Sequence, residues 1–116
     1  MIKRKKEMQV DIRENMRDGE GKVEITHIFK KEELKGKARL HARVKLNPGC
    51  SIGMHEHSDE EEIYYILKGY GRADDNGTVV EIGPGDAILT GDGAYHSIEN
   101  NGSEAMEFIA TILIYN

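Results

Sequence analysis

Residues 49–69 read GCSIGMHEHSDEEEIYYILKG, and this stretch decides both the fold class and the chemistry expected of the chain. His55 and His57 are two positions apart, so both imidazoles point to the same face of an extended strand. Glu62 follows, and His96 arrives from a distant segment, just after a Gly-Asp-Gly turn. Neutral imidazole is the commonest protein ligand for transition metals, and a carboxylate adds an anionic oxygen. We therefore predict a metal site inside a β-barrel, with His55, His57, Glu62 and His96 as its ligands.

The carboxylate of this site has to be chosen from an acidic run that leads into an apolar strand. Glu62 directly precedes the apolar residues and shares strand parity with Tyr64 and Ile66, which we expect to line the cavity. Parity favours Glu62 over Glu61 as the ligand, and Glu60 and Glu61 are expected to form a solvated acidic turn. For Tyr64 an ordinary core position, with its hydroxyl hydrogen-bonded, stays open as the alternative.

The predicted ligand set narrows the choice of metal. Three imidazoles and one carboxylate leave coordination positions open for water or a ligand, unlike the closed shell of a structural zinc site. The set contains no thiolate, so nothing in it selects a soft metal. We expect a divalent ion as the cofactor, manganese or iron first, with zinc and nickel as alternatives.

Composition indicates a single globular domain of 116 residues, with 38% hydrophobic and 32% charged residues. The net charge of −5 argues against general nucleic-acid binding. No apolar run approaches the roughly 20 residues of a membrane span, and the basic N-terminal residues lead into no apolar signal segment. Cys50 is the only cysteine, which agrees with a reducing compartment. We therefore expect a cytoplasmic protein with neither a nucleic-acid nor a membrane partner.

Short alternating segments separated by turns indicate an all-β fold, either a barrel or a sandwich. Residues 1–21 are expected to form a partly ordered N-terminal arm or an edge strand. Residues 106–115 read as a long strand that is apolar on both faces, so we expect it to be covered on both sides. Residues 100–102, Asn-Asn-Gly, are a hairpin signal. The other strands are predicted at 23–29, 40–46, 63–67, 78–82, 87–90 and 95–99.

Two segments of the chain resemble the paired motifs of the cupin superfamily. The first, residues 49–69, matches the family pattern at its bounding glycines and at His55, His57 and Glu62. The second, residues 85–100, departs from the pattern at Gly91, where the family usually has proline, and matches it at Gly85, Gly93, His96 and Asn100. The resemblance implies that residues 1–116 form one cupin domain. Such a domain is a small antiparallel jelly-roll barrel, or double-stranded β-helix, that holds manganese, iron, nickel or zinc and is very often a homodimer.

Within this family, the chain is similar to one half of an oxalate decarboxylase. The resemblance implies that the metal chelates a small dicarboxylate while an arginine, three residues before the first histidine, orients the far carboxylate; Ile52 occupies that position here. Arg39, Arg43 and Arg72 are other candidate cations. Arg39 and Arg43 alternate with the apolar side of their strand, so we expect them to face solvent or a partner chain.

Three functions stay open at this point. The resemblance implies a metal-dependent protein that binds, and as a decarboxylase would transform, a small oxygen-rich carboxylate such as oxalate. A non-catalytic module that holds a sugar or a small acid on its metal is the second hypothesis. A dioxygenase or an isomerase on the same scaffold is the third, because fold alone does not decide chemistry. The sequence offers no clear catalytic acid or base beyond the ligands, so the catalytic residues are left unassigned.

Overall fold

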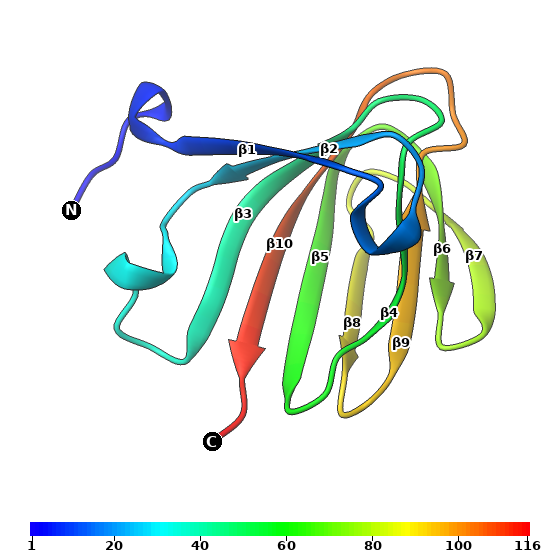
Figure 1. The fold of residues 1–116 in the computed structure, drawn as a ribbon. Helices are drawn as coiled ribbons and strands as arrows, with labels where there is room; N and C mark the ends of the chain where they lie inside the picture. Colours follow the sequence, from blue (N-terminus) through cyan, green and yellow to red (C-terminus); the bar gives the residue numbers. More distant parts are fainter.

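The computed structural model describes residues 1–116 and consists of two antiparallel β-sheets that face each other as a small barrel (Figure 1). This confirms the predicted all-β fold class. None of the helical segments has the length and apolar character of a transmembrane helix. The larger sheet has the order β1 (Gln9–Glu14), β2 (Lys22–His27), β3 (Ala38–Leu46), β10 (Met106–Ile114), β5 (Glu60–Lys68) and β8 (Ala87–Gly91). The smaller sheet has the order β4 (Ser51–Glu56), β9 (Tyr95–Glu99), β6 (Gly71–Asp75) and β7 (Thr78–Ile82).

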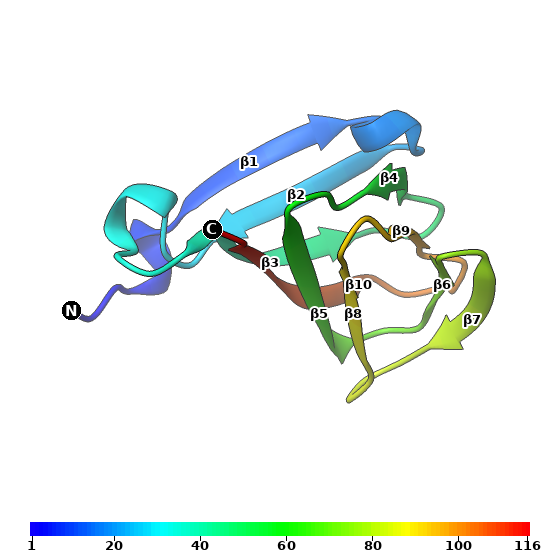
Figure 2. The same ribbon diagram turned by 90° about the horizontal axis from the view of Figure 1, so that it is seen from below.

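Three short 3₁₀ turns complete the fold, and they are η1 (Lys5–Glu7), η2 (Met16–Asp18) and η3 (Lys31–Glu33). β1 is the outer strand of the larger sheet, and together with β2 it extends past the body of the barrel (Figures 1 and 2). After β1 the chain returns to the barrel through η2, which lies against β4.

The core consists of side chains that the two sheets point toward each other. Residues that lie directly opposite on antiparallel strands share a face of the sheet. Ile25, Val44, Phe108 and Ile66 form one such row across β2, β3, β10 and β5, and all four are buried. The smaller sheet adds the row Ile52, Ile98 and Ala73, which is buried as well.

The connection between β9 and β10 differs from the predicted hairpin. β9 pairs with β4 and β6 in the smaller sheet, whereas β10 pairs with β3 and β5 in the larger one. Residues 100–102 therefore carry the chain from one sheet to the other, and the hairpin prediction is wrong. The expectation that the last strand is covered on both sides is also not met within one chain, because the outer face of β10 is only half buried.

Asn100 ties this crossing to the rest of the barrel. Its side chain is buried, and its Nδ2 atom donates hydrogen bonds to the carbonyl oxygens of Leu46 and Glu104, both at 2.8 Å. Its Oδ1 atom accepts a hydrogen bond from the backbone N–H of Gly102 at 2.9 Å. One amide side chain thus satisfies three backbone groups in the two loops where the sheets exchange strands.

We predict that Asn100→Ala lowers the free energy of unfolding by about 3 kcal/mol, because it removes three hydrogen bonds and leaves buried backbone groups unpaired. Urea denaturation followed by circular dichroism measures the change. The control is Asn101→Ala, which removes an exposed side chain with one long contact of 3.5 Å to Glu81. This control should shift stability by no more than about 0.5 kcal/mol. Equal midpoints for the two variants would contradict the role given to Asn100.

The turn after β1, residues 15–21, is here called the N-terminal corner. Asn15, Arg17 and Asp18 have φ angles of 50°, 55° and 64°, in the left-handed region. Asparagine and aspartate tolerate this region, but for a long side chain such as arginine it costs about 1–3 kcal/mol. The surrounding contacts must therefore compensate for the backbone strain at Arg17.

Close backbone contacts with β4 hold the N-terminal corner in place. The backbone N–H of Ser51 donates to the carbonyl oxygen of Glu20, and the N–H of Glu20 donates to Ser51 Oγ, both at 2.8 Å. A Cβ atom on Gly53 would lie only 1.9 Å from the carbonyl oxygen of Arg17. Because Gly53 has no side chain, the N-terminal corner can lie directly on the strand that carries His55.

Candidate metal centre

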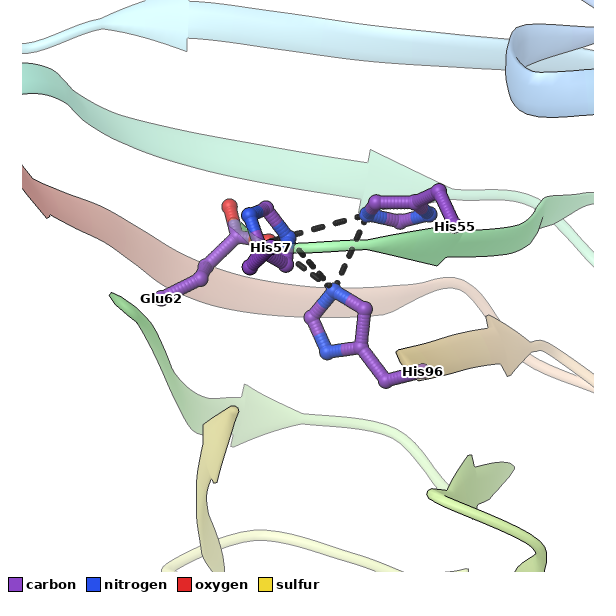
Figure 3. A group of neighbouring side chains, drawn as sticks. All are labelled: His55, His57, Glu62 and His96. Atoms are coloured by element: carbon purple, nitrogen blue, oxygen red, sulfur yellow. Dashed lines mark hydrogen bonds and ion pairs between the residues drawn. The ribbon is translucent and has the colours of Figure 1, made fainter. Parts of the chain in front are cut away.

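The four predicted ligand side chains converge inside the barrel (Figure 3). His96 Nε2 lies 3.0 Å from the Nε2 atoms of both His55 and His57. Glu62 Oε1 lies 2.9 Å from His57 Nε2, 3.1 Å from His96 Nε2 and 3.9 Å from His55 Nε2. His57, Glu62 and His96 are buried, and His55 is partly buried. The group is therefore positioned to hold a metal ion.

A β-bulge sets the direction of the histidine pair on β4. His55 lies opposite His96 of β9, and the register shifts between Ile52 and His55. In a regular strand Ile52 and His55 would face opposite sides, since three steps separate them. The bulge lets both point inward, while Met54 is 47% exposed.

Glu62 and His57 reach the same point from neighbouring segments. Glu62 lies in β5 on the inward face, opposite Ile112 of β10 and Thr90 of β8. His57 follows the end of β4, where its backbone N–H donates to the carbonyl oxygen of Ala94 at 3.0 Å. The turn before His96 thus holds His57, and the distant histidines are fixed relative to each other through the backbone.

Hydrogen bonds on the far side of two rings determine which nitrogen faces the centre. His55 Nδ1 is 2.7 Å from the carbonyl oxygen of Gly53, which can only accept, so Nδ1 carries a proton. His57 Nδ1 donates in the same way to Glu60. In their neutral forms both rings must then present an Nε2 lone pair to the centre. His96 Nδ1 is buried with no hydrogen-bond partner.

Burial and hydrogen bonding oppose each other in setting the protonation of the group. Burial on its own raises the pKa of Glu62, but hydrogen bonds with the three histidines outweigh it and hold the pKa well below its usual range. Burial lowers the pKa of His57, whereas hydrogen bonds to Glu62 and Glu60 give a net rise. The pKa of His96 is lowered, chiefly by burial. At neutral pH Glu62 is an anion and His96 a neutral imidazole, the forms in which these groups bind metals.

The donor atoms also fit a divalent ion in their spacing. The contacts among His57, His96 and Glu62 and between His55 and His96 span 2.9–3.1 Å. Neighbouring ligand atoms of an octahedral ion with bonds of about 2.1 Å are separated by about 3.0 Å. Neutral nitrogens with one anionic oxygen suit divalent first-row transition metals.

A sequence profile described as the cupin domain matches residues 42–112, a stretch that contains all four converging side chains. The chain belongs to the cupin family. This cupin is 48% identical over 114 residues to the oxalate-binding protein of Thermotoga maritima, with 98% of this chain and 94% of that protein covered. The resemblance to cupins seen in the sequence motifs is therefore confirmed.

Solved structures agree with this assignment. A crystal structure from Thermotoga maritima, described as a predicted oxalate decarboxylase, matches the cupin with a TM-score of 0.93 and 48% identity, covering 98% of this chain and 99% of that one. A cupin barrel protein from Rhodopseudomonas palustris has a TM-score of 0.75 at 13% identity, covering 97% of this chain and 78% of its own. The second likeness shows the fold alone.

A cavity of about 440 Å³ opens over the converging side chains of the cupin. Tyr64 lines it, and its ring stacks on His96 with centroids 4.9 Å apart. Burial, and then the charge of Glu62, raise the pKa of Tyr64 well above its ordinary value. Ile66, which was expected at this cavity, is instead fully buried in the core row and does not line it.

Glu60 and Glu61 do not form a solvated turn, and that prediction is wrong, because both residues lie in β5. Glu60 has only 14% of its side chain exposed. It accepts the hydrogen bond from His57 Nδ1 and two more from Arg39, at 2.7 and 2.8 Å. The guanidinium of Arg39 holds the pKa of Glu60 below its usual value. Glu61 faces the outer side of the strand, where it accepts a hydrogen bond from the hydroxyl of Tyr115.

Arg39 points toward the site, contrary to the expectation that it faces solvent or a partner chain. β10 pairs Ile112 with Leu40 but Leu113 with Ala38, so Arg39 is the extra residue of a β-bulge. A bulge reverses the alternation that the sequence suggests, and Arg39 consequently lines the cavity. Arg43 lies in the regular part of β3, and on the outer face it pairs with Glu107.

Three charged residues that line the cavity, Arg13, Glu14 and Arg17, are not indicated as site residues by the sequence motifs. The alternation of residues along β1 could have revealed Arg13. Val10 and Ile12 alternate on β1 and are 49% and 55% exposed, so Arg13 lies on the opposite, barrel-facing side with Val23. No pattern in the sequence indicates that Arg17 returns to the same cavity, because its position depends on the left-handed backbone of the N-terminal corner.

We predict that Glu60→Gln weakens manganese binding by about 10- to 100-fold. The carboxylate of Glu60 orients the His57 ring and increases the basicity of that ring, and the substitution removes this anion. It also places a neutral amide next to the N–H donors of Arg39. Competition with a chelator measures the dissociation constant. Glu61→Gln is the matched control, because that carboxylate faces away from the histidines, and it should bind manganese as the unmodified protein does. Equal losses in both variants would refute the role of the Glu60 contact.

Proposed function

We propose that this cupin binds manganese or iron(II) through His55, His57, Glu62 and His96 and takes oxalate or a similar small carboxylate as its ligand. The main observation that supports this proposal is that four donor groups converge under a cavity whose wall also contains arginines. The relative from Thermotoga maritima is described as an oxalate-binding protein, which supports the same class of ligand.

When bound, the ion would supply Lewis acidity and a fixed positive charge. The chain's own residues prepare the site for it. Because His55 and His57 donate their Nδ1 protons to Gly53 and Glu60, both present Nε2 to the centre without rearrangement. Apolar side chains on the cavity wall reduce the water around a small anion and so strengthen its electrostatic attraction to the site. These side chains include Leu40, Val44 and Ile112.

Decarboxylation is a second candidate function, favoured by the position of Glu14 on the cavity wall. Conversion of oxalate to formate breaks the carbon–carbon bond, releases carbon dioxide and places one proton on the remaining carbon. A carboxyl group beside the ligand could deliver that proton. Binding remains the first proposal, because the Glu14 side chain is 69% exposed and lies 4.0 Å from Lys22.

The proposal predicts about one manganese ion per chain in the purified, manganese-loaded protein, and loss of that ion in His96→Ala. His41→Ala is the control, since His41 contacts Thr111 and lies outside the group. Elemental analysis measures the metal. Isothermal titration of the loaded protein with oxalate measures ligand binding, and a formate assay with and without oxygen measures turnover. Failure of the loaded protein to bind oxalate would refute the proposed ligand, and formate production would favour the second candidate.

We also propose that the protein is a homodimer formed through the outer face of the larger sheet. Val10, Thr26, Arg43 and Ile109 lie in one row across the outer face of β1, β2, β3 and β10. Val10 and its neighbour Ile12 are about half exposed, and β1 is an open edge strand. A second copy of the chain would cover these apolar side chains and protect the edge.

Accordingly, the double variant Val10→Lys/Ile12→Lys should convert the protein from dimer to monomer, because it places charges in the apolar contact. Light scattering coupled to size-exclusion chromatography measures the mass at about 10 μM chain. Val79→Lys is the control, because Val79 is 58% exposed on β7 of the smaller sheet. A monomeric mass for the unmodified protein would exclude the dimer.

A further inference from the structure

The N-terminal corner brings positive charge to the cavity over the metal centre. Arg13 and Arg17 both line this cavity, and neither guanidinium forms an ion pair or a hydrogen bond within the chain. The other arginines near strands behave differently. Arg39 is engaged by Glu60, Arg43 by Glu107, and Arg72 by two glutamates. Arg13 at the end of β1 and Arg17 in the N-terminal corner are therefore cations that are free to bind an anion from outside the chain.

The backbone at Arg17 is held in a conformation that its residue type disfavours. Its φ of 55° lies in the left-handed region, where glycine or asparagine would be accommodated more easily. The backbone contact at Gly53 fixes this conformation and anchors Arg17 beside the strand that carries His55. Strain of this kind is retained where the surrounding structure enforces it, often at binding sites.

Arg17 lines the same cavity as three of the converging side chains. His55, His57 and Glu62 lie on the wall of this cavity together with Arg17. Tyr64, whose ring stacks on His96, lies on the wall as well. Arg17 and the converging groups therefore border one space.

The net charge of the metal centre bears on which anions the cavity can hold. A divalent ion together with ionised Glu62 carries a net charge of +1, since the three imidazoles are neutral. A monocarboxylate such as acetate would neutralise that charge completely. A dicarboxylate such as oxalate would leave an excess negative charge in a partly apolar cavity, which is costly unless a cation compensates for it. One guanidinium supplies the missing charge, together with a planar pair of donors that matches a carboxylate.

We propose that Arg17 forms the subsite for the second carboxylate of a dianionic ligand, so that the cavity selects small dicarboxylates over monocarboxylates. This inference rests on the proposed function, because it requires the first carboxylate to be held at the metal centre. Arg17 acts as a binding and specificity residue. It contributes nothing to holding the metal, as it lies outside the group of four donors.

The test compares Arg17→Asn with the unmodified protein, both loaded with manganese. Asparagine accepts the left-handed backbone, so the fold and its stability should be retained or slightly improved. Isothermal titration should show oxalate affinity reduced by about 10- to 100-fold, as expected for loss of a charge-assisted hydrogen-bonded pair. Acetate affinity and manganese content should not change. Arg17→Lys, which keeps the charge but not the planar pair of donors, should show an intermediate loss.

Arg72→Gln is the matched control, because it removes one arginine charge from an exposed position on β6 that does not line the cavity. It should bind oxalate and acetate as the unmodified protein does. Unchanged oxalate affinity in Arg17→Asn would overturn the inference while leaving the proposed function intact. Equal weakening of oxalate and acetate would also overturn it, since Arg17 would then act on any anion. If the unmodified, manganese-loaded protein binds no oxalate, the proposed function itself fails.

Discussion

The structure depends on one electrostatic constraint, which is that three imidazole nitrogens and a carboxylate oxygen face one another inside the barrel. His55 and His57 donate their Nδ1 protons to Gly53 and Glu60, so in their neutral forms both rings point Nε2 lone pairs at Glu62 and His96. Lone pairs and a negative charge at separations near 3 Å repel each other unless a positive charge lies among them. A proton can meet this need in part, and a divalent metal ion can meet it for all four groups.

The backbone departs from regular geometry where this constraint requires it. Gly53 is the clearest example, because three features of the site meet there. It lies in the bulge that turns His55 inward, its carbonyl oxygen accepts the Nδ1 proton of His55, and its missing side chain admits the carbonyl of Arg17. The bulge at Arg39 has a comparable role on β3, since it turns a cation toward Glu60 and thereby supports His57. Irregular positions in both sheets thus lie directly behind the converging imidazoles of His55 and His57.

The arginines that line the cavity differ in their roles. Arg39 is neutralised by Glu60 and through this carboxylate helps to orient His57, so it has little charge left for an anion. Arg13 and Arg17 enter from a segment that precedes the cupin motifs in the sequence and are unpaired. Ile52, which stands where an arginine was expected from the resemblance, is instead a buried residue of the core. The unpaired positive charge of this cavity is therefore provided by the end of β1 and by the N-terminal corner.

The sequence by itself determined the all-β class, the family and the grouping of His55, His57, Glu62 and His96, because strand parity and motif spacing are local properties of the chain. The metal, the compartment and the oligomeric state stay predictions.

Only the tertiary structure decided that Glu60 and Arg39 stand behind His57, and that Ile66 belongs to the core. A bulge inverts strand parity without leaving a clear mark in the residue pattern, so alternation assigned Arg39 to the wrong face. The approach of Arg17 was equally hidden, since it arises from a left-handed turn packed against a glycine more than thirty residues away.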